Sequence, residues 1–303
     1  MMHNSLLLQT NLNEGKGREN VMESVLREEI CRFVREESAN RFPDAAAPYF
    51  DAPLMAFAAA TDPLFTEYKS VIGEFHLTPQ ELVAASTPAD PWIPATVICW
   101  VLPITEQTRA SNREERVYPS RPWAETRNFG EQFNTALRRH LLAWLRERGC
   151  RAAAPQLMPA WRELGETPVG IASTWSERHA AFAAGLGTFS LNDALITPQG
   201  IAHRLGSVIT DLVLVASPRP YPERRANCLY YREGTCGACI GRCPVGALSH
   251  HGHDKNKCRE YVYGAIPAAV GESYGVAATG CGLCQTKVPC EGRIPAGKKP
   301  YLV

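Results

Sequence analysis

The spacing of the cysteines in the C-terminal part of the chain constrains its fold most strongly. Eight of the eleven cysteines lie after residue 227, in the order Cys-x7-Cys-x2-Cys-x3-Cys-Pro, then a single cysteine, then Cys-x2-Cys-x5-Cys. They are Cys228, Cys236, Cys239, Cys243, Cys258, Cys281, Cys284 and Cys290. A [4Fe–4S] cluster takes four thiolates, and in two-cluster ferredoxins the cysteine before a proline binds the other cluster. The eight thiols therefore match two [4Fe–4S] clusters.

A zinc site is the alternative interpretation of the same cysteines. Cys236-x2-Cys239 and Cys281-x2-Cys284 could together make one four-cysteine zinc ribbon. That arrangement leaves four cysteines without a role and does not explain the Cys243-Pro dipeptide. The spacing favours iron–sulfur clusters, with a single cluster or a mixed site as the remaining options.

Composition gives no sign of a nucleic-acid or membrane partner. The 303 residues include 32 Lys and Arg against 31 Asp and Glu, a formal net charge of +1. Such a balance lacks the basic excess that nucleic acids and acidic membranes attract. The longest apolar runs are shorter than a bilayer span, and the first residues lack the basic region of a signal peptide. We therefore expect a soluble cytoplasmic protein, in which Cys31, Cys99 and Cys150 are ordinary small apolar residues.

Apolar periodicity predicts mixed α/β structure upstream of the cysteines. Helices are expected over residues 20–38, 122–149 and 176–185, and buried strands over 94–104 and 206–216. Strands separated by long helices indicate an α/β core. Three prolines within residues 217–222 predict a linker, because proline disfavours helix and cannot donate to a sheet.

These elements predict three segments. Residues 1–19 are expected to be a flexible N-terminal segment, 20–217 an α/β domain for cofactor and substrate, and 218–303 a small ferredoxin-like domain with two [4Fe–4S] clusters. Between the cysteines, His250, His251 and His253 lie in a polar stretch with glycine and are expected in a solvated loop rather than among the ligands.

Motifs upstream of the cysteines add a family resemblance. They are Glu177-Arg178, Ala184-Gly185-Leu186-Gly187, Leu205-Gly206-Ser207 and Thr210-Asp211-Leu212. With the cysteine segment, they make the chain resemble the epoxyqueuosine reductase family over about residues 95–292. The ferredoxin-like part of reductive dehalogenases is similar at a greater distance.

The resemblance implies an α/β domain that binds a corrinoid (cobalamin), fused to a domain with two [4Fe–4S] clusters that pass electrons to cobalt. It also implies two ligand sets. One is Cys228, Cys236, Cys239 and Cys290, and the other is Cys243, Cys258, Cys281 and Cys284.

The glycine-rich turn after residue 184 has two interpretations. It could simply end a helix. Alternatively, Gly185, Leu186 and Gly187 let the backbone approach a flat macrocycle closely, and hydroxyl or amide groups nearby bond its edge. Those groups would be Ser190, Asn192, Ser207 and Thr210. His179 and His203 are the candidate proton donors.

Two functions follow. The first is an iron–sulfur oxidoreductase that uses a corrinoid on an unknown small molecule and takes electrons from a ferredoxin or flavodoxin type of donor. The second is a ferredoxin-type electron carrier without substrate chemistry. No carboxylate lies between Glu166 and Glu177, where the resembled epoxide reductases carry an aspartate. We therefore expect little epoxyqueuosine reduction and no nucleic-acid partner.

Overall fold

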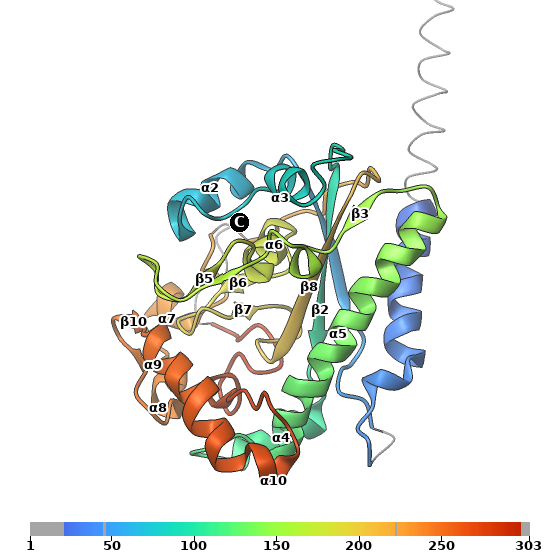
Figure 1. The fold of residues 1–303 in the computed structure, drawn as a ribbon. Coiled ribbons are helices and arrows are strands. Elements are labelled where there is room, and N and C mark those ends of the chain that lie inside the picture. Colours follow the sequence, from blue (N-terminus) through green and yellow to red (C-terminus); the bar gives the residue numbers. More distant parts are fainter. Residues whose placement is uncertain (1–20, 45–46, 222, 298–303) are drawn as a thin grey trace, which may run out of the picture.

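A computed structural model describes residues 21–44, 47–221 and 223–297, so the expected flexible segment 1–19 lies outside the described residues. Its centre is an antiparallel four-stranded sheet in the order β1-β2-β8-β3 (Figure 1). The strands are β1 (Leu54–Ala59), β2 (Thr96–Pro103), β8 (His203–Thr210) and β3 (Ala152–Ala153). All eight residues of β2 are buried, as expected for a β-branched apolar run covered on both faces.

One face of the sheet is covered by two helices. A helix over residues 21–36 packs beside α5 (Arg121–Glu147), on the right of Figure 1. The hydroxyl of Ser120 accepts a hydrogen bond from Trp123 N and caps α5. Leu137, Leu141 and Leu145 form the fully buried stripe of α5 against the sheet. The helices predicted over 20–38 and 122–149 are therefore confirmed, with small differences at their ends.

The other face carries three shorter helices, α2 (Pro63–Ile72), α3 (Pro79–Ser86) and α6 (Glu177–Ala183). Ser176 caps α6 through His179 N, and Gly185 follows it with φ of +83°, as predicted for residues 176–185. Phe65 stacks on the buried Trp175 in this second half of the core. The sheet is thus a middle layer between two layers of helix.

Short elements connect these layers to the site. Two small hairpins, β4 (Glu163–Leu164) with β5 (Ala172–Ser173) and β6 (Thr188–Phe189) with β7 (Leu195–Ile196), lie between α5 and β8 in the sequence. The 3-10 helices η1 (Ser38–Asn40) and η2 (Pro155–Leu157) are further connections. The predicted strand 206–216 differs from β8, which begins at His203 and ends at Thr210. Val213 and Val215, which continue its apolar run, are exposed.

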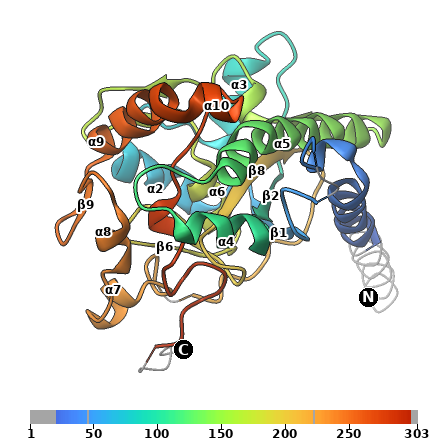
Figure 2. The ribbon, with the colours of Figure 1, turned by 90° about the horizontal axis from the view of Figure 1, so that it is seen from below.

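The cysteine segment folds from short pieces under the α/β part (Figure 2). The pieces are α7 (Leu229–Glu233), α8 (Ala238–Arg242), β9 (Leu248–Ser249), β10 (Gly252–His253), α9 (Lys255–Glu260), η3 (Tyr261–Ala265), η4 (Pro267–Gly271), α10 (Glu272–Tyr274) and η5 (Leu283–Gln285). They pack against α5 and α4 (Glu106–Glu114). The predicted histidine loop is the β9–β10 hairpin, where His250 and His251 are exposed but His253 is half-buried and ion-paired to Asp193.

Candidate iron–sulfur and cofactor site

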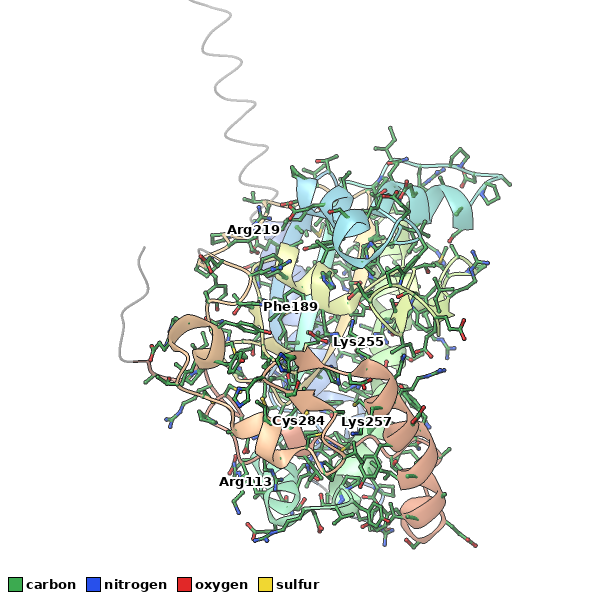
Figure 3. All side chains as sticks on the ribbon, turned by 90° about the vertical axis from the view of Figure 1, so that its left-hand side faces the viewer. Arg113, Phe189, Arg219, Lys255, Lys257 and Cys284 are labelled. Atoms are coloured by element: carbon green, nitrogen blue, oxygen red, sulfur yellow. The ribbon has the colours of Figure 1, made fainter. Side chains whose placement is uncertain are left out.

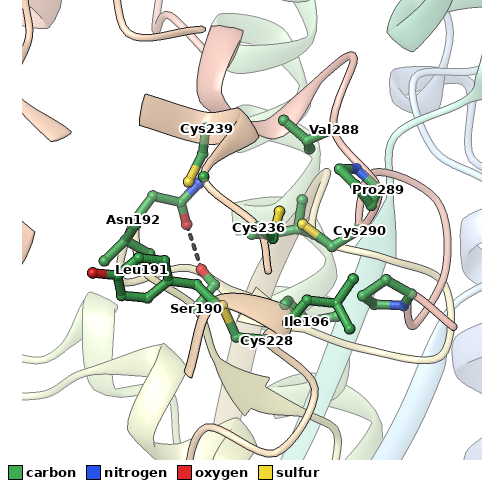
Figure 4. A pocket seen from close by; sticks show the side chains of 15 residues that line it. Ser190, Leu191, Asn192, Ile196, Cys228, Cys236, Cys239, Val288, Pro289 and Cys290 are labelled. Atoms are coloured by element: carbon green, nitrogen blue, oxygen red, sulfur yellow. Dashed lines mark hydrogen bonds between the residues drawn. The ribbon is translucent and has the colours of Figure 1, made fainter. Parts of the chain in front are cut away.

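Four thiols line one cavity in the C-terminal segment. Cys228, Cys236, Cys239 and Cys290, the first thiol set, face this cavity together with Ile196 and Val288 (Figure 4). Cys290 comes from a distant loop that is held in place, since its carbonyl accepts a hydrogen bond of 2.9 Å from Ile201 N. Burial raises the pKa of Cys239 to about 11, and the neighbouring Cys228 and Cys236 add to the rise. Gathered thiols of this kind ionise when a metal binds them.

The remaining four cysteines form a second thiol set, Cys243, Cys258, Cys281 and Cys284. Burial raises the pKa of Cys281 to about 12, and Cys258 and Cys243 raise it further. Ala247 N donates to the sulfur of Cys243 over 3.2 Å, the kind of amide contact that stabilises a cluster thiolate. Burial raises the pKa of Cys284, and the thiols of Cys281, Cys258 and Cys239 raise it further. Because Cys239 belongs to the first set, the two sets are neighbours.

This grouping bears on the zinc interpretation. The pair Cys236 and Cys239 belongs to the first set, whereas Cys281 and Cys284 belong to the second. Within residues 21–44, 47–221 and 223–297, no three His, Cys, Asp or Glu side chains gather closely enough for a single metal ion. The two cysteine pairs that a zinc ribbon would combine thus fall in different sets.

Two large cavities lie between the α/β part and the cysteine segment. The inner cavity, of about 670 Å³, is lined by Trp161, Trp175, His203 and Cys258 among others. The outer cavity, of about 650 Å³, is lined by Tyr68, His179 and Phe189 among others. Both volumes are in the range of ligand pockets. The cavities share six residues, here called the junction: Ile171, Ala172, Ser173, Ser176, Arg178 and Lys255.

A buried charge network supports the wall of the inner cavity. Glu131 binds Arg204 and Arg138, and Arg138 also contacts Glu177 at 3.4 Å. Burial alone would raise the pKa of Glu131, but Arg204 and Arg138 outweigh it and hold the pKa at about 2. Burial raises the pKa of Glu177, whose Oε2 has no hydrogen-bond partner. The network therefore combines one carboxyl group of lowered pKa, Glu131, with one of raised pKa, Glu177.

The two predicted proton donors both lie at cavity walls but are neutral at pH 7. Burial lowers the pKa of His179 to about 3 and that of His203 to about 4. His179 Nδ1 bonds Ser176 Oγ at 2.8 Å, and His203 Nε2 bonds the Leu195 carbonyl at 2.8 Å. A ring that carries no charge at neutral pH is a weak acid, which disfavours proton donation by either histidine.

The seven residues predicted to contact a macrocycle line neither large cavity. A Cβ on Gly185 would meet the backbone of Pro218, and one on Gly187 the backbone of Ile196. Leu186 is part of the core.

The three hydroxyl groups of that prediction are occupied inside the protein. Ser190 bonds Asn192 and lines the cavity of the first thiol set. Ser207 accepts from Trp175 Nε1, and Thr210 donates to the Arg151 carbonyl. Of the three, Ser207 holds Trp175, which lines the inner cavity.

Sequence reasoning missed most of the residues that line the cavities. Glu177 and Arg178 were visible as a motif, but no role was assigned to either. Lys255 lies in a polar stretch that predicts a solvated loop. Glu131 lies among the charged residues of an amphipathic helix, a pattern that does not predict a buried ion pair. Only long-range pairing brings them together, and a single sequence carries no local signal of it.

Comparison with known proteins identifies a relative for part of the chain. No family model matches. The epoxyqueuosine reductase of Bacillus anthracis is 32% identical over 119 residues, which are 38% of this chain and 29% of that protein. The match therefore spans less than a third of the length of this curated relative.

Solved structures with a similar fold include reductases of two kinds. An epoxyqueuosine reductase with a tRNA-Tyr stem loop is 18% identical, with a TM-score of 0.49, over 92% of this chain and 68% of that chain. An epoxyqueuosine reductase from Bacillus subtilis is 18% identical, with a TM-score of 0.46 and the same coverage. A catabolic reductive dehalogenase is 15% identical, with a TM-score of 0.49, over 80% of this chain and 30% of that chain.

One expectation about partners needs correction. From the near-neutral net charge, no nucleic-acid partner is expected. The similar structure of an epoxyqueuosine reductase with a tRNA stem loop contradicts this expectation. A balanced total charge says nothing about local basic walls, and Arg178, Arg204 and Lys255 line the inner cavity.

Across the part of the chain that is described, no helix has the length and apolar character needed to cross a bilayer. In sequence, the chain is thus similar to epoxyqueuosine reductase over 38% of its length.

Proposed function

We propose that the chain is an iron–sulfur reductase of the epoxyqueuosine reductase type. Two [4Fe–4S] clusters, held by the first and second thiol sets, would deliver electrons to a corrinoid in the inner cavity. One observation carries the proposal: Cys258 belongs to the second thiol set and also lines the inner cavity. A cluster held there would border the cavity directly.

The thiol sets also suggest a direction for the electrons. Cys236 and Gly237 line both the cavity of the first set and an outward hollow of about 560 Å³ beside Tyr230, Tyr231 and His250. A ferredoxin or flavodoxin type of donor could approach the first cluster there. Cys239 and Cys284 then link the first set to the second.

The residues present fit a large, partly polar cofactor. The inner cavity combines the aromatic surfaces of Trp161 and Trp175 with the charged groups Arg204 and Glu131, and Trp161 Nε1 is buried without a hydrogen-bond partner. These residues would hold a corrinoid, which when bound supplies a strongly reducing cobalt centre. The protein itself would exclude water and orient the substrate.

The name of the curated relative makes epoxyqueuosine in tRNA the first substrate to test. The stretch before α6 lacks a carboxylate, but Glu177 and Glu131 bring two carboxyl groups to the inner cavity wall. Burial raises the pKa of Glu177, which makes it the better candidate of the two for a proton donor.

The test uses anaerobically prepared protein with its clusters assembled. We expect saturable cobalamin binding, seen as a change in corrinoid absorption, and reduction of the bound corrinoid once the clusters are reduced. Cys258→Ala should bind cobalamin but lose the reduction. Absence of any cobalamin binding by the wild type would reject the reductase. Reduced clusters that pass electrons only to another protein would establish the electron-carrier alternative.

A further inference from the structure

Two cations meet at the junction of the two cavities. Arg178 comes from α6 in the α/β part, and Lys255 from the start of α9 in the cysteine segment. Both side chains line both cavities. In Figure 3, Lys255 lies between Phe189, which lines the outer cavity, and Cys284 of the second thiol set.

The stems of both side chains are fixed by the protein. The Cβ of Lys255 packs near Gly170, in the loop between β4 and β5. Arg178 Nη1 donates to the Asp193 carbonyl over 2.8 Å. Arg178 is exposed to solvent, although neighbouring protein groups partly desolvate its guanidinium. Both groups are therefore held toward the cavities.

Neither cation has an ion-pair partner among the described residues. The nearest acid, Asp193, uses its carboxylate on His253 Nδ1 at 3.1 Å. Other cations of the inner cavity are paired, Arg204 with Glu131 and Arg259 with Glu163. Asp193 also attracts Arg178 and Lys255 through space, so one carboxylate is shared among three cationic groups and the junction keeps a net positive charge.

The partial burial of Lys255 makes its positive charge energetically unfavourable. Burial lowers the pKa of Lys255, Asp193 partly offsets this effect, and the nearby Arg178 lowers the pKa further. Two like charges that are partly removed from water repel each other more strongly than they would on an open surface. Solvated surface cations do not have this environment. An anion between Arg178 and Lys255 would reduce their repulsion and would accept hydrogen bonds from both side chains.

We propose that the junction binds an anionic oxygen group, a phosphate or a carboxylate, of the molecule that occupies the cavities. Arg178 offers a planar fork of donors and Lys255 a point charge, a pair suited to such a group. This inference deepens the proposed function, because it gives the chemical class of one end of the ligand. It does not require a corrinoid to be bound.

The test measures binding of inorganic phosphate and of acetate to the cluster-loaded protein by calorimetry, at constant ionic strength and without reductant or corrinoid. We expect one saturable site per chain for at least one of the two anions, and their comparison separates phosphate from carboxylate. Arg178→Gln and Lys255→Gln should each weaken that binding by about tenfold. Arg178→Lys, which keeps the charge, should lose less.

Arg224→Gln is the matched control, because Arg224 is exposed and lines the outer cavity outside the junction. It should bind as the wild type does. No saturable heat from either anion with the wild type would overturn the proposal. The same holds if folded Arg178→Gln with full iron content binds normally. Since this assay needs no catalysis, a missing reductase activity would reject the proposed function and leave the anion site standing.

Discussion

Gly187 shows how one residue supports the site without touching a ligand. It lies directly against the backbone of Ile196, where no side chain fits. Gly187→Ala should therefore destabilise the fold by roughly 1–3 kcal/mol, the usual cost of overpacking a filled interior. Thermal unfolding should show an apparent Tm several degrees lower. Gly241→Ala is the control, since its position in α8 is open, and it should be at least as stable as the wild type.

The buried histidines should give the fold a distinctive pH dependence. Burial lowers the pKa of His203 to about 4 and that of His76 to about 4, below the ordinary value near 6.5. Between these values the unfolded chain binds more protons, so stability falls as pH drops from about 6.5 toward 4.

Denaturant unfolding at several pH values between 5 and 7 measures this slope. His203→Gln should reduce it by about one proton, or about 1.4 kcal/mol per pH unit. His251→Gln, at an exposed position, should not change it. An unchanged slope in His203→Gln would show that the ring is already protonated in the folded protein.

At the scale of elements, α9 joins the two functional regions. It carries Lys255 at its start and Cys258 one turn later, so one short helix faces both the junction and the second thiol set. Cys258→Ala should lower the iron content from about eight to about four atoms per chain, because one of two clusters is lost. Cys31→Ala should keep all the iron, since Cys31 lies in the helix over residues 21–36. Equal losses in both variants would contradict the division into thiol sets.

The elements also show what a sequence can and cannot predict here. The long helix α5 and the buried strand β2 were predicted, because their apolar stripes repeat over many residues. The assignment of the eight cysteines to two ligand sets stays a prediction, although the four thiols of the first set line one cavity. The cavity walls were not predicted. They come from two-residue strands and from side chains such as Glu131 that pair across more than seventy positions.

At the scale of the whole molecule, the cysteine segment is bonded tightly to the α/β part. Glu291 is buried and binds Arg113 at 2.5 Å, and Asn112 donates to Thr286 Oγ1 at 3.1 Å. Arg242 donates to the Glu115 carbonyl at 2.8 Å. The separate ferredoxin-like domain, residues 218–303, stays a prediction, and these bonds argue that it does not unfold alone.

We therefore expect one cooperative transition. In an anaerobic denaturant titration, loss of the visible cluster absorption should coincide with loss of helical circular dichroism from the α/β part. Glu291→Gln, which weakens the contact with Arg113, should shift both curves together. Bleaching of the clusters well before the helices unfold would instead show two independent units.

The position of Cys290 has a consequence for biosynthesis. The second thiol set is complete once residue 284 has left the ribosome, whereas the first set, which opens with Cys228, still lacks its fourth thiol. That thiol reaches its place only when the Cys290 carbonyl meets Ile201 N, a contact with a part of the chain made much earlier. In the proposed ligand sets, the cluster whose ligands start first is therefore finished last.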